Sequence, residues 1–126
     1  MQTLHIVNQA YRATLEEQDD PVLWFVQVLR GAEADVSVLL RGSAVNYLVF
    51  RQDASGIAFG EWRQSQPPRM AAAIVELISN RAPVHVVEDD LAERGIRARD
   101  CIAGFQTIAR ARIGELVEQF DRVWQW

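Results

Sequence analysis

Five polar side chains follow apolar runs that have the composition of β-strands. In open α/β sheets, ligands bind in the crevice at the carboxyl ends of the strands. If the chain forms a binding pocket, we therefore expect these side chains to line it. They are Asn8, Ser43, Glu88, Asp89 and Asp90.

The run of three carboxylates, Glu88–Asp90, is the most conspicuous of these groups. One interpretation is an acid/base or cation site, since carboxylates supply both kinds of chemistry. The other is structural: Asp89 or Asp90 caps a short helix and favours its positive end. We prefer the structural interpretation, because a run of acids alone does not define a reaction. No catalytic residue is assigned.

The chain has one cysteine, Cys101, so it forms no intrachain disulfide and gives no sign of an oxidising compartment. A thiolate here would be nucleophilic if Arg97 and Arg99 faced it. The alternative is a small buried hydrophobic residue. His5 and His85 are isolated in the sequence, and we expect both to be packed side chains. We predict no metal site and no cofactor, because zinc-ligand spacings and glycine-rich phosphate loops are absent.

The 126 residues carry 13 basic and 17 acidic side chains, a net charge of −4, and 49% of them are hydrophobic. This predicts one globular domain over 1–126 and argues against nucleic-acid binding, which usually needs a basic surface. All 13 basic residues are arginine, which excludes lysine chemistry. The apolar runs are shorter than a membrane span and the N-terminus lacks a signal-peptide pattern, so we expect a cytoplasmic protein without membrane contact.

Strand-like and helix-like segments alternate along the chain, which predicts a parallel sheet covered on both faces. We therefore expect an α/β fold: a single-domain three-layer α/β/α arrangement with a mostly parallel sheet of about five strands. The expected strands are 4–8, 35–40, 84–87, 103–107 and 122–126. The expected helices are 21–30, 44–52, 69–81, 91–94 and 109–120. Residues 53–68 are predicted to form an irregular loop or lid, with a short strand inside it as a further option, and such a segment in a small domain is often functional.

A helix is expected at 21–30, because Asp20 can cap its start, Pro21 suits its first position and Gly31 suits the C-cap. This predicted helix is apolar on nearly all of its surface. A helix that covers one face of a sheet usually has a polar back. We therefore expect its second face to be covered too, by another subunit.

Trp124 and Trp126 lie two apart on the last strand and share a face. We expect them to pack on the core or on a partner, with stacking on a ligand as the alternative.

Several short blocks resemble the DsrE/DsrF/DsrH family, which includes the TusB, TusC and TusD sulfur-relay subunits. The blocks are Leu4–Asn8, Val84–Ile96 with its Asp-Leu-x-x-Arg-Gly motif at Asp90–Gly95, Ile102–Phe105 and Asp121–Trp126. The first block, the motif and the terminal tryptophan are most similar to the DsrH/TusB branch. The resemblance implies a small α/β fold and assembly into trimers or hexamers.

In this family, a cysteine accepts sulfur as a persulfide and passes it on. Its place before the Arg-Gly turn corresponds to Val87, or to Asp90 in members with two cysteines, and neither residue is a cysteine here. Persulfide chemistry needs a thiolate. The resemblance therefore implies a non-catalytic or accessory subunit of a cytoplasmic sulfur-relay-like assembly. Its partners would be family-related subunits, in a homo- or hetero-oligomer, and a sulfur-carrier protein.

Two alternatives stay open. One is a persulfide carrier with sulfurtransferase-like activity that uses the off-motif Cys101. The other is a small-ligand binding module under residues 53–68. Whether the chain is an enzyme therefore depends on the chemistry of its single thiol.

Overall fold

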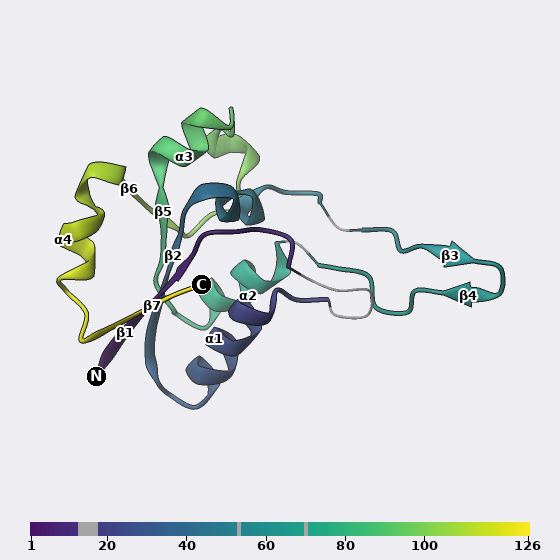
Figure 1. Ribbon diagram of the computed structural model, residues 1–126, viewed down its shortest axis with the longest axis horizontal. Helices are drawn as coiled ribbons and strands as arrows, with labels where there is room; N and C mark the ends of the chain where they lie inside the picture. The colour runs from purple at the N-terminus through teal and green to yellow at the C-terminus, as the bar shows by residue number, and fades with distance from the viewer. Residues whose placement is uncertain (13–17, 53, 70) are drawn as a thin grey trace.

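The computed structural model describes residues 1–12, 18–52, 54–69 and 71–126. Its centre is a five-stranded sheet in which every pair of neighbours is parallel, in the order β6-β5-β2-β1-β7. The strands are β1 (Gln2–Val7), β2 (Asp35–Leu40), β5 (Val84–Val87), β6 (Gln106–Ile108) and β7 (Arg122–Gln125). The structure thus confirms the predicted α/β fold with its parallel sheet flanked by helices (Figure 1).

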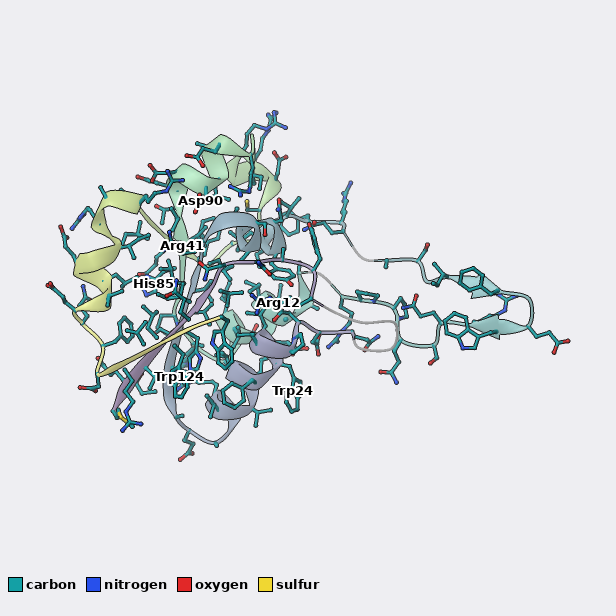
Figure 2. All side chains as sticks on the ribbon, viewed as in Figure 1. Arg12, Trp24, Arg41, His85, Asp90 and Trp124 are labelled. Atoms are coloured by element: carbon teal, nitrogen blue, oxygen red, sulfur yellow. The ribbon has the colours of Figure 1, made fainter. Side chains whose placement is uncertain are left out.

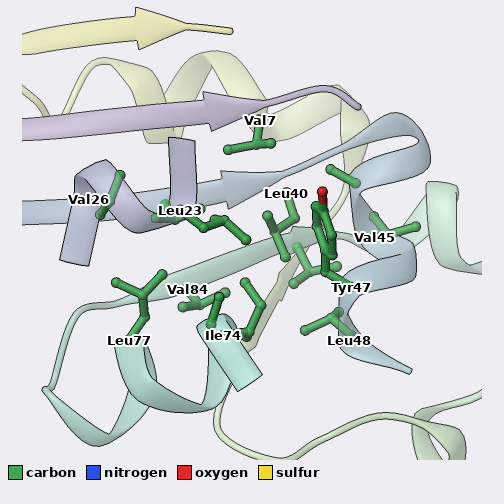
Figure 3. Close-up of a cluster of buried hydrophobic side chains, with 14 of the residues drawn as sticks. Val7, Leu23, Val26, Leu40, Val45, Tyr47, Leu48, Ile74, Leu77 and Val84 are labelled. Atoms are coloured by element: carbon green, nitrogen blue, oxygen red, sulfur yellow. The ribbon is translucent and has the colours of Figure 1, made fainter. Parts of the chain in front are cut away.

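Two helices and a 3₁₀ segment cover one face of the sheet. They are α1 (Pro21–Gly31), α2 (Ala72–Ser79) and η1 (Gly42–Leu48). Leu23, Ile74 and Leu77 from the helices meet inward-facing strand residues such as Leu40 and Val84 (Figure 3). This larger core is a contiguous cluster of buried hydrophobic residues, so it supplies most of the hydrophobic stabilisation of the fold.

The opposite face carries a smaller cluster under α4 (Ile113–Val117). Leu4, Ile6 and Leu39 of the two central strands pack there against Val87 and Leu116. Alternate residues of β1 therefore enter different cores, as the two-residue repeat of a strand requires. The three-layer arrangement follows from this alternation.

The start of α1 confirms the predicted helix signals. Oδ1 of Asp20 accepts hydrogen bonds from the backbone N–H groups of Val22, at 2.8 Å, and Leu23, at 3.3 Å. Pro21 occupies the first helical turn, where its missing N–H costs nothing. The helix includes Gly31, so its C-cap is Ala32 rather than the predicted Gly31.

Several predicted elements are shorter or shifted. The helix expected at 44–52 is a 3₁₀ helix that ends at Leu48, because Val49 pairs in an isolated antiparallel bridge with Cys101. The helix expected at 69–81 covers Ala72–Ser79, because the N–H of Arg69 is bonded to the carbonyl of Gln18, at 2.7 Å. Residue 70 of that prediction lies outside the described residues.

In the last third of the chain, several elements also begin or end at other residues than predicted. Helix α3 covers Glu88–Glu93, so it begins three residues before the predicted 91–94. Strand β6 begins at Gln106 instead of 103, after Gly104 turns the chain with φ +105°. The helix expected at 109–120 is divided into a 3₁₀ turn, Arg110–Arg112 (η3), and α4. A further 3₁₀ turn, Ala98–Asp100 (η2), precedes Cys101.

The segment predicted as an irregular loop or lid contains a regular antiparallel hairpin, β3 (Ala58–Phe59) with β4 (Trp62–Arg63). Gly60 has φ +59° at the first position of the two-residue connection, where such turns favour glycine. In Figure 1 the hairpin projects away from the sheet, so these residues do not lie over the strand ends. Position 53 of the predicted loop lies outside the described residues. No described helix is long and apolar enough to cross a membrane.

Candidate functional site

The five residues predicted to line a pocket lie at or just beyond the carboxyl ends of β1, β2 and β5, as expected. Two of them tie loops together. The Asn8 amide donates a hydrogen bond to the carbonyl oxygen of Trp126, at 3.0 Å. Ser43 Oγ accepts one from the N–H of Ala10, at 3.1 Å. Both side chains thus use polar atoms to fix neighbouring backbone.

Asp90 is the centre of a polar cluster at this edge (Figure 2). Its side chain is buried, with Oδ2 2.8 Å from the N–H of Gly42 and Oδ1 2.7 Å from Nη2 of Arg110. Arg94 lies further away, at 3.7 Å. Burial favours the neutral acid, but the Gly42 bond and Arg110 outweigh it and hold the pKa of Asp90 below its usual value.

The other two acids have different surroundings. Asp89 Oδ1 accepts a hydrogen bond from the backbone N–H of Arg110, at 2.7 Å. Glu88 lines a cavity of about 410 Å³ together with His85 and Arg112. All three acids lie in the first turn of α3, where negative charge is favourable, but none caps it: Val87 is the N-cap and makes no side-chain bond. The predicted helix-capping role is therefore wrong.

Arg110 joins Asp89, Asp90 and Glu93 into one network, and it is not among the residues that the sequence predicts for the site. A signal was present: Arg110 follows β6, whose carboxyl end meets the same edge as that of β5. The prediction that β6 begins three residues earlier concealed that signal. The network is internally satisfied, so these residues hold α3 to the neighbouring strand ends.

Gly42 allows β1 and β2 to end side by side. Its φ is +57°, and a Cβ atom at this position would lie 2.8 Å from the backbone oxygen of Asn8. Only glycine combines that conformation with so close an approach. The backbone N–H of Gly42 also donates the hydrogen bond to Asp90 Oδ2, so the turn and the polar cluster share this residue.

The two positions that the resemblance assigns to a sulfur-accepting cysteine are occupied by structural residues. Val87 is fully buried in the smaller core. Asp90 is engaged by Gly42 and Arg110 as described above. Neither position presents the thiol that persulfide chemistry needs.

Cys101 is buried in the larger core, as the structural interpretation predicts. Burial, and secondarily the Asp100 carboxylate, raise the pKa of its thiol. Its S–H faces the carbonyl oxygen of Arg97, at 3.5 Å, while the Arg97 side chain bonds Asp100, at 2.9 Å. Arg97 thus does not activate the thiol.

A second candidate site, which we call the groove, lies between α1 and the β1–β7 pair and has a volume of about 540 Å³. Its aromatic walls are His5, Phe25, Trp124 and Trp126. The rings of Trp124 and Trp126 stack with centroids 6.2 Å apart, and Phe25 meets Trp126 edge-on, at 6.1 Å. The sequence predicts that the two tryptophans share a face, but it does not predict the groove.

His5 lies in the floor of the groove and is almost fully buried, so the prediction of a packed histidine is confirmed. Trp126 Nε1–H donates to His5 Nδ1, at 3.3 Å. Burial lowers the pKa of His5, which favours the neutral ring. With Nδ1 accepting, the proton of the neutral ring is on Nε2, which has no hydrogen-bond partner among the described residues.

A metal centre finds no support in the part of the chain that the structure describes: it contains no group of three or more His, Cys, Asp or Glu side chains that could hold an ion. The two candidate regions therefore differ in kind. The strand-end cluster is polar and internally paired, and the groove is apolar and open.

Comparison with known proteins gives a result at the level of the fold. No family model matches the sequence, and no curated protein matches it. Among solved structures, the YchN protein from E. coli has a TM-score of 0.69 and 20% identity, with full coverage of both chains. MTH1491 from Methanobacterium thermoautotrophicum, a protein of unknown function, has a TM-score of 0.60 and 13% identity, covering 99% of this chain and 98% of that one. The likeness extends over essentially the whole chain and shows that it shares the α/β fold of these two proteins.

Proposed function

We propose that the chain is a non-catalytic, accessory subunit of a cytoplasmic sulfur-relay-like assembly of the DsrE type. One observation carries the proposal: no thiol occupies the positions where the family resemblance expects one, and Cys101 is buried with a raised pKa. A sulfur acceptor needs an accessible thiolate. The DsrE-like fold supports the kind of assembly, and the missing nucleophile supports a subunit that binds rather than transfers.

The outward face of α1 supports a partner-binding role. Trp24, Phe25 and Val28 are exposed there, although the inward face of the same helix is fully buried. Phe25 also contacts Trp126, which joins this face to β7. Exposed apolar patches of this kind are typical of protein interaction sites. We propose that this face contacts family-related subunits, in a trimer or hexamer.

The alternative role as a persulfide carrier is tested by the intact mass of the folded protein after incubation with a low-molecular-weight persulfide. We expect no reducible gain of one sulfur atom in the native protein. After unfolding in urea, the same treatment should modify the wild type but not Cys101→Ser, which proves that the reagent works. A gain in the folded wild type that is absent from Cys101→Ser would show that the chain is a carrier.

The accessory role is tested by co-expression with DsrE-type subunits that carry the strand-end cysteine. We expect a stable hetero-complex in native mass spectrometry, and we expect Trp24→Glu to weaken it because a charge would enter an apolar contact. Val75→Glu is the matched control, since Val75 is a similarly exposed apolar residue on α2. A chain that joins no such subunit contradicts the proposal.

A further inference from the structure

The hairpin β3–β4, which we call the arm (57–64), exposes two large aromatic side chains at its tip. Phe59 is 70% exposed and Trp62 is 43% exposed, and their rings stack with centroids 6.2 Å apart. Only two residue pairs form the ladder, supplemented by a bond from Gln64 N–H to the Ile57 carbonyl, at 2.9 Å. A two-stranded hairpin alone is marginally stable in water. The arm therefore has the composition of an element that packs against another surface.

The groove has the matching composition. Its walls are the rings of Phe25, Trp124 and Trp126, and Trp124 is 51% exposed, so an occupant can reach them. Aromatic side chains gain from offset or edge-on contact with other rings beyond the apolar area that they bury. A volume of about 540 Å³ accommodates a few side chains, not a folded element. The tip of a narrow hairpin is an occupant of that size.

The charges around the two features are complementary. The groove rim carries Glu33 and Asp35 on one side of β1 and Arg122 on the other. Glu61 and Arg63 flank the arm's Trp62. Within the described ranges, none of these five side chains takes part in an ion pair. Arg63 can meet the acidic side of the rim while Glu61 meets Arg122.

The arm does not reach the groove of its own chain. It projects from the body in Figure 1, and none of its residues is among those that line the groove. The two features therefore meet only between molecules. We propose that the arm of one copy inserts Phe59 and Trp62 into the groove of a second copy of this chain.

Such a contact joins different surfaces of the two copies. If two copies each insert their arm into the groove of the other, they form a closed dimer. If each copy instead inserts its arm into the groove of the next copy, the assembly closes only when the copies form a ring. In both assemblies each arm occupies one groove, so no arm and no groove is left without a partner. The proposal does not depend on the relay function, because sulfur chemistry takes no part in it.

The experiment measures self-association by sedimentation with four proteins. Trp62→Ser removes one ring of the arm and Trp124→Ser removes a groove wall, and both side chains are roughly half exposed, so the fold should tolerate their loss. Phe50→Ser is the matched control, since Phe50 is 49% exposed and belongs to neither feature. We expect wild type and Phe50→Ser to associate alike, and each of the other two to bind about tenfold more weakly or worse, as for an interface anchor.

Mixing the two weakened variants makes the test specific. Trp62→Ser still has an intact groove and Trp124→Ser still has an intact arm, so an equimolar mixture should form mixed complexes that neither variant forms alone. A loss caused by misfolding or by an unrelated contact would not be restored in this way. Failure of the mixture to associate overturns the proposal.

Cross-linking gives an independent readout on the Cys101→Ser background. Copies carrying Glu61→Cys and copies carrying Arg122→Cys should form a disulfide with each other, and Phe50→Cys should form none with Arg122→Cys. The proposal is overturned if the wild type is monomeric at all concentrations. It is also overturned if the groove holds a small molecule bound at His5 Nε2 and Trp62→Ser associates like the wild type. Neither result bears on the persulfide test, so failure here and failure of the relay role are distinguishable.

Discussion

The strand-end cluster and the groove are both rich in side chains that the sequence analysis considered, yet they behave differently. In the cluster, Asp90 has a backbone donor and a guanidinium as partners, and Asp89 has a backbone donor. In the groove, stacked tryptophan rings face open space and the rim charges have no ionic partner among the described residues. One region is complete within the chain, and the other is completed only by a second molecule.

The comparison teaches that residue type is a weaker guide to function than whether the side chain's interactions are already satisfied. Three consecutive acids suggested chemistry, but two of them, Asp89 and Asp90, use their carboxylates to hold strand ends and α3 together. Two tryptophans at the end of the chain suggested packing on the core or on a partner, with stacking on a ligand as the alternative, and they form the walls of an open groove. Satisfied polar groups stabilise the fold, and exposed rings are available for binding.

The largest effect should come from removing the centre of the satisfied region. Asp90→Ala leaves the Gly42 N–H and the Arg110 guanidinium without their buried partner. We expect a loss of about 2–4 kcal/mol in the free energy of unfolding, measured in urea. Asp89→Ala, which removes a single bond to an exposed backbone group, is the control and should cost about 1 kcal/mol. Equal losses for the two variants would contradict the central place of Asp90.

A second large effect is expected at the turn. Gly42→Ala introduces a Cβ atom 2.8 Å from the Asn8 backbone oxygen at a φ of +57°. We expect a loss of about 1–3 kcal/mol, because both the contact and the conformation are strained. Gly60→Ala has a similar φ but open space around the new atom, so it isolates the conformational part. If Gly42→Ala is as stable as Gly60→Ala, the contact between the new Cβ atom and the Asn8 backbone oxygen costs nothing, which contradicts this prediction.

The stability of the cluster should also depend on pH. The pKa of Asp90 is lower in the folded protein than in the unfolded chain, so its contribution is complete above the unfolded value, about 3.9. That contribution is lost as the pH falls through the lower folded value. Between pH 6 and pH 3 the wild type should therefore lose more stability than Asp90→Asn. If the free energies of unfolding of the two proteins change in parallel with pH, the pKa of Asp90 is not lowered by folding.

Removing the exposed rings should have a small effect on folding and a large one on association. We expect Trp62→Ser and Trp124→Ser to unfold within about 0.5–1 kcal/mol of the wild type, since surface substitutions usually cost little. Thermal and urea unfolding of dilute protein measure this. A loss as large as that of Asp90→Ala would mean that the rings belong to the fold, and the contrast between the two regions would disappear.

The smallest effect concerns the rim charges. Exposed pairs are screened by salt, so raising the ionic strength from about 0.05 M to 0.5 M should weaken self-association only a few-fold. Arg63→Gln should flatten this dependence, because the arm would lose its charge toward Glu33 and Asp35. Arg51→Gln is a control outside both arm and groove. A salt dependence unchanged by Arg63→Gln would contradict the proposed charge pairing.

Local signals predicted the fold well. The cap Asp20, the proline after it and the apolar runs of β1, β2 and β5 are decided by near neighbours in sequence, so these elements were found within one or two residues. Boundaries failed where tertiary contacts decide them, as at Leu48, where the bridge between Val49 and Cys101 ends the 3₁₀ helix. The residues at the strand ends were correctly located by the rule for parallel sheets.

The candidate site was harder to predict, because its properties depend on partners distant in sequence. Arg110 and Asp90 meet through β6, whose start was predicted too early. The groove needs α1, β1 and β7 together, and these come from the two ends of the sequence. The arm was hidden for another reason: a ladder of only two residue pairs leaves almost no alternating pattern to detect.

The position of β7 beside β1 has a kinetic consequence. The Gln2 N–H is bonded to the Asp121 carboxylate, at 2.7 Å, across a separation of 119 residues. Closing a loop of that length costs roughly 4 kcal/mol of chain entropy before the contact contributes anything. β1 and β2 are joined by a much shorter connection, so they can pair first, and β7 docks late. Until it does, the outer edge of β1 is open to pairing with any other extended chain, which makes this the interval in which misassembly competes with folding.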